Sequence, residues 1–255
     1  MLKGSPHSRR TGPRFGILGG TFDPPHFAHL FIAQEALARL GLDRVYFVPA
    51  GEPPHKMGRQ ISDSSHRLAM LERAIAGNAG FAITTIELGR PGPSYTVDTL
   101  AQLRAEWGPQ SELAFILGWD MLLDLPHWHQ PRQIVRALDW VVAIHRPGYD
   151  AEWSDDEAIM SALPGLSAKL IRLPIPQLGI SATDLRSRVA SSLPIRYLVP
   201  DSVADYIAEH GLYRGVAGTS ADAPAARHVD ARGRTSSASV HLPHDRHAPD
   251  QEVRL

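Results

Sequence analysis

The sequence predicts an α/β fold in which a doubly wound parallel sheet carries helices on both faces. Three observations support this prediction. Short, nearly continuous apolar runs recur along the chain, as is typical of strands buried on both faces of a parallel sheet. Segments with apolar residues at helical spacing separate these runs. The 255 residues, of which 43% are hydrophobic and 21% charged, suffice for an α/β domain with a sizeable core.

Six apolar runs are the expected strands. They are FGILGG (15–20), RVYFVP (44–49), FAITTIEL (81–88), ELAFILG (112–118), DWVVAIH (139–145) and AKLIRL (168–173). None of them alternates strictly between apolar and polar residues, which favours strands covered on both faces. Ligands of such open α/β sheets bind at the carboxyl ends of the strands, so the loops that follow these runs are the places to search for a site.

Helical patterns lie between the strands. One helix is expected from about Ala28 to Leu40. A second follows the SDSS cluster, and a third begins behind Ser94, which is the expected N-cap. The apolar residues that define the second and third helices are Leu68, Leu71 and Ile75, then Val97, Leu100, Leu103 and Trp107.

Composition divides the chain into three parts. Residues 1–13 are expected to be a flexible leader, and residues 14–214 the folded domain. Residues 216–255 contain no Phe, Trp, Tyr or Ile and are rich in Ala, Ser, Asp, Arg, Pro and His. Such a segment buries too little apolar surface to offset its loss of conformational entropy. Residues 215–255 are therefore predicted to be a disordered tail.

Bulk properties exclude several classes of function. A formal net charge of −1 argues against nucleic acid as a partner, because such binders normally carry a strong basic excess. The chain has no cysteine, which removes disulfides, thiolate zinc sites and cysteine nucleophiles and fits a reducing compartment. The basic N-terminus is not followed by an apolar stretch, and no apolar run is long enough to cross a bilayer. We therefore expect a cytoplasmic protein that does not bind membranes.

The stretch GGTFDPPHFAHL (19–30) is the first candidate site. It lies between the end of the first expected strand and the start of a helix, where backbone N–H groups and the helix dipole favour an anion. Gly19 and Gly20 would let a ligand approach the backbone closely. His26 and His29 would project to one side of the first helical turn, and a bound polyphosphate could hold one of them protonated as a donor.

Two other interpretations of this stretch stay open on its residues alone. A metal site would use both histidines and Asp23, but no further ligand declares itself. The stretch could also be only a crowded turn. It does not match the G-x-G-x-x-G dinucleotide fingerprint or the Walker A loop, so dehydrogenase and P-loop interpretations are disfavoured.

A second stretch, GISATDLRSRV (179–189), also opens a helix. In the plainest interpretation Ser181 is an N-cap paired with Asp184, and the arginines are merely solvated. The same residues can instead bind an anion, because Ser181 and Thr183 offer hydroxyl donors and Arg186 offers a guanidinium that forks onto phosphate oxygens. Two such helix N-termini in one α/β domain would suit a triphosphate.

Together these stretches resemble the signature motifs of the nucleotidylyltransferase superfamily, GGTFDP-x-H-x-x-H and IS-x-T-x-x-R. The pieces between them are similar to those of bacterial nicotinate-nucleotide adenylyltransferases. These pieces are VPAGEPPHK (48–56), PSYTVDTL (93–100), FILGWDML (115–122), LPHW (125–128), HRPGY (145–149) and YLVPDSVADYIAEHGLY (197–213). The resemblance covers residues 14–214 in order and implies a Rossmann-like sheet of the nucleotidylyltransferase type.

This resemblance implies a reaction. AMP would pass from ATP to nicotinate mononucleotide, giving nicotinate adenine dinucleotide (deamido-NAD) and pyrophosphate in NAD biosynthesis. The attacking group is already a phosphate anion, so direct in-line attack needs no general base and no covalent intermediate. The enzyme would supply positioning and neutralise developing charge. Mg²⁺ would be carried with ATP, without a dedicated protein metal site.

Matching positions also imply residue roles. The catalytic residues would be His26, His29 and Arg186, with His29 stabilising the transition state. ATP would also be bound by Gly19, Gly20, Thr21, Phe22, Gly118, Asp120, Ser181 and Thr183. Nicotinate mononucleotide would meet Lys56, Thr96, Trp128, His129 and Arg146, with Trp128 stacking on the pyridine ring and Lys56 and Arg146 near its phosphate.

The sequence departs from the family pattern at a few positions, and rival functions remain. Ala28 replaces a glycine common between the two histidines, and Ala182 removes a hydroxyl from the second motif. Rivals include a sister enzyme that uses nicotinamide mononucleotide or another phosphate acceptor, a catalytically silent nucleotide-binding regulatory module, and a metal-dependent hydrolase. Neither the resemblance nor the composition predicts the oligomeric state.

Overall fold

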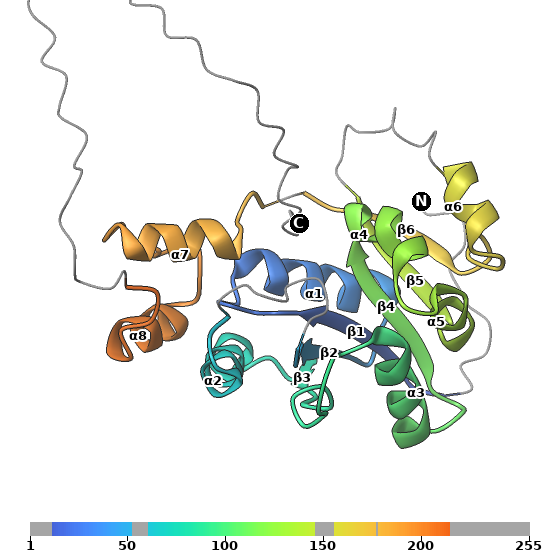
Figure 1. Ribbon diagram of the computed structural model, residues 1–255, viewed down its shortest axis with the longest axis horizontal. Helices are drawn as coiled ribbons and strands as arrows, with labels where there is room; N and C mark the ends of the chain where they lie inside the picture. The colour runs from blue at the N-terminus through green and yellow to red at the C-terminus, as the bar shows by residue number, and fades with distance from the viewer. Residues whose placement is uncertain (1–11, 53–60, 146–155, 177, 215–255) are drawn as a thin grey trace, which may run out of the picture.

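The structure, a computed structural model, describes residues 12–52, 61–145, 156–176 and 178–214. These residues form a parallel six-stranded sheet in the order β3-β2-β1-β4-β5-β6. The strands are β1 (Arg14–Gly20), β2 (Arg44–Pro49), β3 (Phe81–Ile83), β4 (Glu112–Gly118), β5 (Trp140–His145) and β6 (Leu170–Pro174). Helices lie on both sides of the sheet (Figure 1). The doubly wound parallel sheet predicted from the sequence is confirmed.

The order in which the chain adds strands to the sheet reverses beside β1. The chain first adds β2 and β3 on one side of β1 and then returns to place β4 on the other side. Leu18 of β1 therefore lies opposite both Phe47 and Ile116. Ligands of doubly wound sheets bind in the crevice outside the carboxyl ends of the strands at such a reversal. Gly20 and Gly118 end the two strands that flank it.

The described helices are α1 (Phe27–Leu40), α2 (Ser64–Ile75), α3 (Thr96–Trp107), α4 (Trp119–Asp124), α5 (Pro131–Ala137), α6 (Asp156–Ala162), α7 (Ala182–Ala190) and α8 (Asp201–Glu209), with a 3₁₀ turn at Leu125–His127. Among them, no helix is long and apolar enough to cross a membrane.

Both faces of the sheet are buried, which explains why the strands are almost continuously apolar. Along β1, Ile17 faces one core and Leu18 faces the other, and each side chain is almost fully buried. The core around Leu18 contains Ile32 and Ala36 of α1. The core around Ile17 contains Leu100 of α3 and residues of α5. This pattern requires apolar residues on both sides of a strand.

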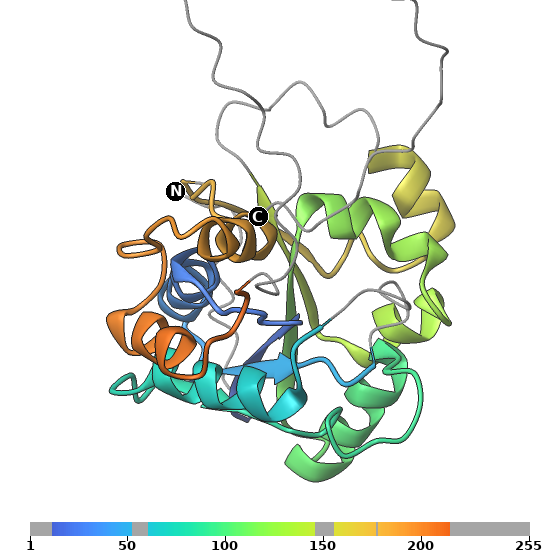
Figure 2. The ribbon, with the colours of Figure 1, turned by 60° about the vertical axis from the view of Figure 1, so that its left-hand side comes forward.

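A third, smaller core joins the C-terminal helices to α2. It contains Met70 of α2, Leu185 of α7, and Val203 and Tyr206 of α8, all of them buried. In both views α7 lies beside α1, and α8 lies next to α2 (Figures 1 and 2). The second sequence motif therefore lies beside the element that carries the first.

The expected third strand was too long. We predicted a strand over residues 81–88, but β3 ends at Ile83 and residues 86–89 form a turn. The chain leaves the sheet after the Thr84 N–H donates to the Phe47 carbonyl at 3.1 Å. The turn brings Glu87 inward, where it accepts a hydrogen bond from the Thr99 hydroxyl at 2.7 Å. A tertiary contact thus overrides the β propensity of this run.

The expected cap of the third helix was also wrong. The N-cap of α3 is Tyr95, and no side chain caps it. Ser94 is buried, and its N–H donates to the Glu52 carbonyl at 3.0 Å, so it belongs to the contact between the two loops. By contrast, α1 begins at Phe27, one residue before the expected start. The leader, apart from residues 12 and 13, and the tail at 215–255 lie outside the described residues.

Candidate active site

The loop after β1 leaves its backbone open to a ligand. Gly19 is exposed, and the position that a Cβ would take there is open space. At Gly20, a Cβ would lie only 2.9 Å from the ring of Phe22. Phe22 is almost fully buried and has a φ of 52°, so its ring packs beneath the loop. Glycine is required at position 20 because the ring leaves no room for a side chain.

The two histidines of this loop are stacked. His26 is the N-cap of α1, and His29 lies in its first turn. Their ring centroids are 3.7 Å apart at an interplanar angle of 23°. The backbone N–H of His26 donates to Nδ1 of His29 at 3.3 Å. When His29 is neutral its proton is therefore on Nε2, the usual consequence of a hydrogen bond to the other ring nitrogen.

Burial favours the neutral form of His26. Only 3% of the residue is exposed, and burial lowers its pKa from 6.5 to about 4. Its side chain faces the backbone N–H of His29 in a capping box, but its buried Nδ1 makes no hydrogen bond of normal geometry within the described residues. Such an atom is unusual in a folded protein, and it is often explained by a functional role or an absent ligand. Burial thus keeps His26 uncharged near neutral pH.

Arg186 connects the two sequence motifs. Its Nη1 donates to the backbone carbonyl of Asp23 at 2.8 Å, and its Nη2 donates to the Thr183 hydroxyl at 3.0 Å. Ser181 is the N-cap of α7 and accepts a hydrogen bond from the Asp184 N–H at 3.1 Å. The expectation of an N-cap at Ser181 is confirmed. The guanidinium nevertheless lies beside the β1–α1 loop, where an anion would sit.

The end of β4 lies beside the end of β1 in the sheet. Gly118 is buried and is the N-cap of α4, and no side chain caps this helix. Asp120 lies in the first turn of α4 and is exposed. Since β4 pairs with β1, Gly118 ends its strand next to the glycine loop, and Asp120 follows in α4. Their use in ATP binding stays a prediction.

The expected acceptor residues form a second group. The rings of Tyr95, which precedes α3, and His129 lie 4.3 Å apart. Thr96 begins α3 and is partly buried. The Trp128 indole N–H donates to Asp124 Oδ2 at 3.0 Å, and its ring packs edge-on against Phe115. The structure thus brings His129 to the N-terminus of α3. Lys56 and Arg146 lie outside the described residues.

Asp23, the third ligand that a metal site would need, is committed to other contacts. Its two carboxylate oxygens accept hydrogen bonds from the Ser62 N–H at 3.1 Å and from the Tyr213 hydroxyl at 2.5 Å. Within the part of the chain that the structure describes, no three His, Asp or Glu side chains gather as a metal-binding cluster.

Comparison with known proteins agrees with this geometry. Residues 17–188 match the family model described as cytidylyltransferase-like. The chain is 48% identical over 203 residues to the probable nicotinate-nucleotide adenylyltransferase of Thermomicrobium roseum, covering 80% of this chain and 92% of that one. It is 47% identical over 204 residues to the protein of that name from Roseiflexus castenholzii, covering 80% and 100%. The chain belongs to the nicotinate-nucleotide adenylyltransferase family.

Solved structures show the same fold at lower sequence identity. Two structures of Plasmodium falciparum nicotinic acid mononucleotide adenylyltransferase, one complexed with APC and one with NaAD, each align with a TM-score of 0.63. Each is 21% identical and covers 79% of this chain and 97% of the other. The nicotinate-nucleotide adenylyltransferase sheet and its helices are thus shared well beyond the bacterial relatives.

Sequence reasoning missed two residues beneath the site, Arg67 and Tyr213. Arg67 is buried and donates from Nη1 to the Thr21 carbonyl at 3.0 Å and to the Ala50 carbonyl at 2.8 Å. Tyr213 reaches Asp23 from the other end of the domain. Tyr213 lies in a piece that resembles the family, but nothing in the sequence pairs either side chain with the first motif.

Proposed function

We propose that this protein transfers AMP from ATP to nicotinate mononucleotide, giving nicotinate adenine dinucleotide and pyrophosphate, as a step in NAD biosynthesis. The observation that carries this proposal is the Arg186 guanidinium, which spans the two motifs by bonding to Asp23 and to Thr183. It brings the N-termini of α1 and α7 to one place, and both helix ends favour anions. Family membership supports the choice of reaction.

The chemistry is a direct displacement at phosphorus. A phosphate oxygen of nicotinate mononucleotide attacks the α-phosphorus of ATP, and the bond from that phosphorus to the bridging oxygen of pyrophosphate breaks. The attacking oxygen is already anionic near neutral pH. The protein must hold the reactants in line and stabilise the charge that develops on the α-phosphate and on the leaving group.

The site residues divide this work. We assign the stabilising hydrogen bond to Nε2–H of His29, because the His26 N–H already occupies its Nδ1. His26 acts as a neutral partner that stacks on His29 and fixes its ring. Arg186, Ser181 and Thr183 hold the outer phosphates. The glycine loop and Phe22 line the nucleotide, while Gly118 and Asp120 meet its ribose.

Mg²⁺ would arrive with ATP, bound by the triphosphate and water. The described groups around the phosphate site are imidazoles, hydroxyls, a guanidinium and backbone N–H groups, and these donors suit phosphate oxygens. A hard cation such as Mg²⁺ prefers carboxylate, carbonyl and water oxygens. The cation would neutralise charge on the phosphates, while the residues named above orient the phosphates.

The acceptor would bind at the N-terminus of α3. No side chain caps this helix, so its first N–H groups and Thr96 suit the nicotinate carboxylate. Trp128 is fixed by Asp124 and would stack on the pyridine ring. We also propose contacts from His129, and from Lys56 and Arg146 to the mononucleotide phosphate. With no cysteine in the chain, the cytoplasm is the expected compartment.

The purified protein should be incubated with ATP, Mg²⁺ and either nicotinate or nicotinamide mononucleotide, and the pyrophosphate and dinucleotide that form should be measured. We expect turnover with nicotinate mononucleotide. In His29→Ala, kcat should fall by about 10²–10³-fold, because one donor to the transition state is lost. His210→Ala is the matched control, because His210 is exposed at the end of α8.

Each other outcome has a distinct meaning. Preference for nicotinamide mononucleotide would identify the sister enzyme. ATP binding without turnover of either mononucleotide would indicate a silent nucleotide-binding module and would overturn the proposed reaction. Near-normal kcat in a folded His29→Ala variant would show that the role assigned to His29 is wrong.

A further inference from the structure

Asp23 is a junction of segments that are far apart in the sequence. It is buried, with 3% of the residue exposed. Its carboxylate accepts hydrogen bonds from the Ser62 N–H and the Tyr213 hydroxyl, and its backbone carbonyl accepts one from Arg186 Nη1. Two residues separate Asp23 from His26. A shift of Asp23 would therefore move both the guanidinium and the start of α1.

Arg67 holds the opposite side of the same loop. Its Nη1 bonds to the carbonyls of Thr21 and Ala50, and its Nε donates to the Ser62 carbonyl at 3.0 Å. Its guanidinium and the Asp23 carboxylate attract each other, and this attraction opposes the lowering of the Arg67 pKa by burial. Buried groups of opposite charge and full hydrogen bonding fix one arrangement of a polar network.

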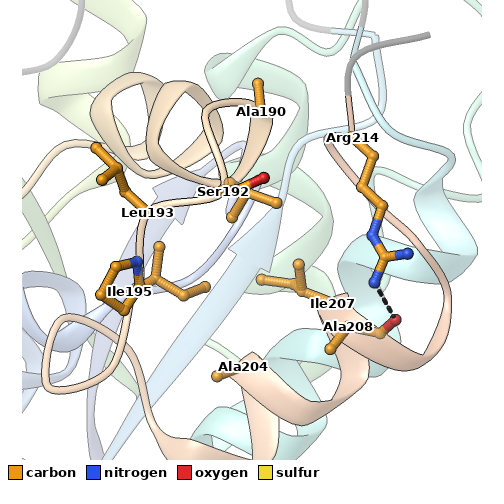
Figure 3. A pocket seen from close by; sticks show the side chains of 10 residues that line it. Ala190, Ser192, Leu193, Ile195, Ala204, Ile207, Ala208 and Arg214 are labelled. Atoms are coloured by element: carbon orange, nitrogen blue, oxygen red, sulfur yellow. Dashed lines mark hydrogen bonds between the residues drawn. The ribbon is translucent and has the colours of Figure 1, made fainter. Parts of the chain in front are cut away.

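Tyr213 is well placed to hold Asp23. Burial, together with the nearby Asp23 charge, raises the pKa of its hydroxyl, so the hydroxyl remains protonated and donates. The neighbours of Tyr213 in the chain are tied to the preceding helix region. The Leu212 N–H donates to the Ile207 carbonyl at 3.0 Å. Figure 3 shows the second bond, which Arg214 Nη2 donates to the Ala208 carbonyl at 3.2 Å. The backbone of Tyr213 is thus held by bonds of both neighbouring residues, and its side chain extends from there to the loop.

We propose, resting on the function proposed above, that Tyr213 is a positioning residue that orients Asp23 and thereby holds the His26 loop against Arg186. It touches no substrate. Without its hydroxyl, Asp23 loses its bond to the C-terminal segment, and the carbonyl that receives Arg186 can turn away. The phosphate-binding groups then spend less time in the geometry needed for in-line transfer, although the domain remains folded.

The test compares two tyrosines at the same end of the domain. Tyr213→Phe removes the bond to Asp23, whereas Tyr206→Phe removes the bond of a buried α8 hydroxyl to Nδ1 of His66 in α2 at 2.9 Å. We expect kcat to fall by about tenfold or more in Tyr213→Phe and to change by less than about twofold in Tyr206→Phe. The KM for nicotinate mononucleotide should stay unchanged in both. A kcat loss in Tyr213→Phe no larger than in the control would overturn the proposal.

Hydrogen exchange separates this proposal from the proposed function. In Tyr213→Phe the amides of residues 19–27 should exchange faster than in wild type, and in Tyr206→Phe they should not. Unchanged exchange in Tyr213→Phe would contradict the positioning role even if the wild type has no adenylyltransferase activity. Absence of wild-type turnover would contradict only the proposed reaction.

A double-mutant cycle tests whether Tyr213 acts through Asp23 or whether Tyr213→Phe lowers kcat by a general loss of structure. Asp23→Asn keeps an oxygen that can accept from Tyr213 but loses the charge that strengthens the bond. We expect Asp23→Asn alone to give an intermediate loss of kcat, and the double variant to lose no more kcat than Tyr213→Phe alone. Independent, multiplying effects of the two changes on kcat would show that Tyr213 does not act through Asp23.

Discussion

His26 illustrates how one buried residue can link the candidate site to stability. Burial lowers the pKa of His26 to about 4, so burying its neutral imidazole costs little free energy at pH 7. At acidic pH the same burial lowers the stability of the folded state. Below about pH 6.5 the unfolded chain binds a proton at His26 that the folded chain does not bind until the pH nears 4. The unfolded state holds more protons in this window, so stability rises with pH there.

We therefore predict that the free energy of unfolding decreases as the pH falls from about 6.5 toward 4. Protonation of His26 in the unfolded state should account for about 2 kcal/mol of this decrease at pH 5. Denaturant unfolding at pH 7 and pH 5 measures this loss. His26→Gln cannot titrate, and its loss should be smaller by about that amount. His127→Gln is the control, because the His127 side chain is 79% exposed. An equal loss in wild type and His26→Gln would contradict the prediction.

At the scale of elements, α7 carries two arginines with different neighbours. Arg186 faces the β1–α1 loop, whereas Arg188 Nε and Nη2 both donate to the Pro194 carbonyl, at 3.1 and 2.9 Å. The sequence offers two similar side chains two positions apart. Only the position of α7 beside α1 shows that Arg186, and not Arg188, could bind phosphate.

This difference gives a paired prediction. Arg186→Lys keeps the charge but loses the fork that reaches Asp23 and Thr183 together, so kcat/KM for ATP should fall by about 10²-fold. Arg188→Lys should change it by less than about twofold, since surface substitutions away from a site are usually mild. Steady-state kinetics with ATP varied at saturating nicotinate mononucleotide measures both. Equal effects of the two changes would remove Arg186 from the phosphate site.

The sheet could be predicted from the sequence because burial on both faces leaves a strong local pattern. Ile17 and Leu18 are adjacent in β1 and lie in opposite cores, so both must be apolar. The end of β3 could not be predicted, since Glu87 turns toward Thr99 in a contact that no local pattern shows. Elements follow from nearby residues, but their exact ends depend on distant ones.

The candidate site follows the same rule. The motifs identified the loops that lie at the reversal of the sheet, because helix starts and glycines are local features. The supports of these loops were missed. Arg67 and Tyr213 are 46 and 190 residues from the groups that they bond, Thr21 and Asp23. A single sequence contains no signal for such pairs, which depend on how the whole chain packs.

At the scale of the molecule, the candidate phosphate site and its supports come from both ends of the described chain. The glycine loop follows β1, while Tyr213 comes from the last described segment. Arg214 lines a groove between α7 and α8 together with Leu193 and Ile207 (Figure 3). The C-terminal segment is therefore part of the folded unit as far as Arg214, and this supports residues 14–214 as the catalytic domain that we propose.

Two truncations test this boundary. Removing residues 216–255 should leave kcat and thermal stability unchanged, because that segment has no Phe, Trp, Tyr or Ile with which to strengthen a core. Removing residues 213–255 deletes only three residues more, but it takes away the hydroxyl that holds Asp23 and the Arg214 bond to Ala208. Its kcat should fall by at least as much as in Tyr213→Phe, by about tenfold or more. Loss of turnover on removal of residues 216–255 would mean that the tail contributes to the site. Normal turnover after removal of residues 213–255 would place the functional boundary before Tyr213.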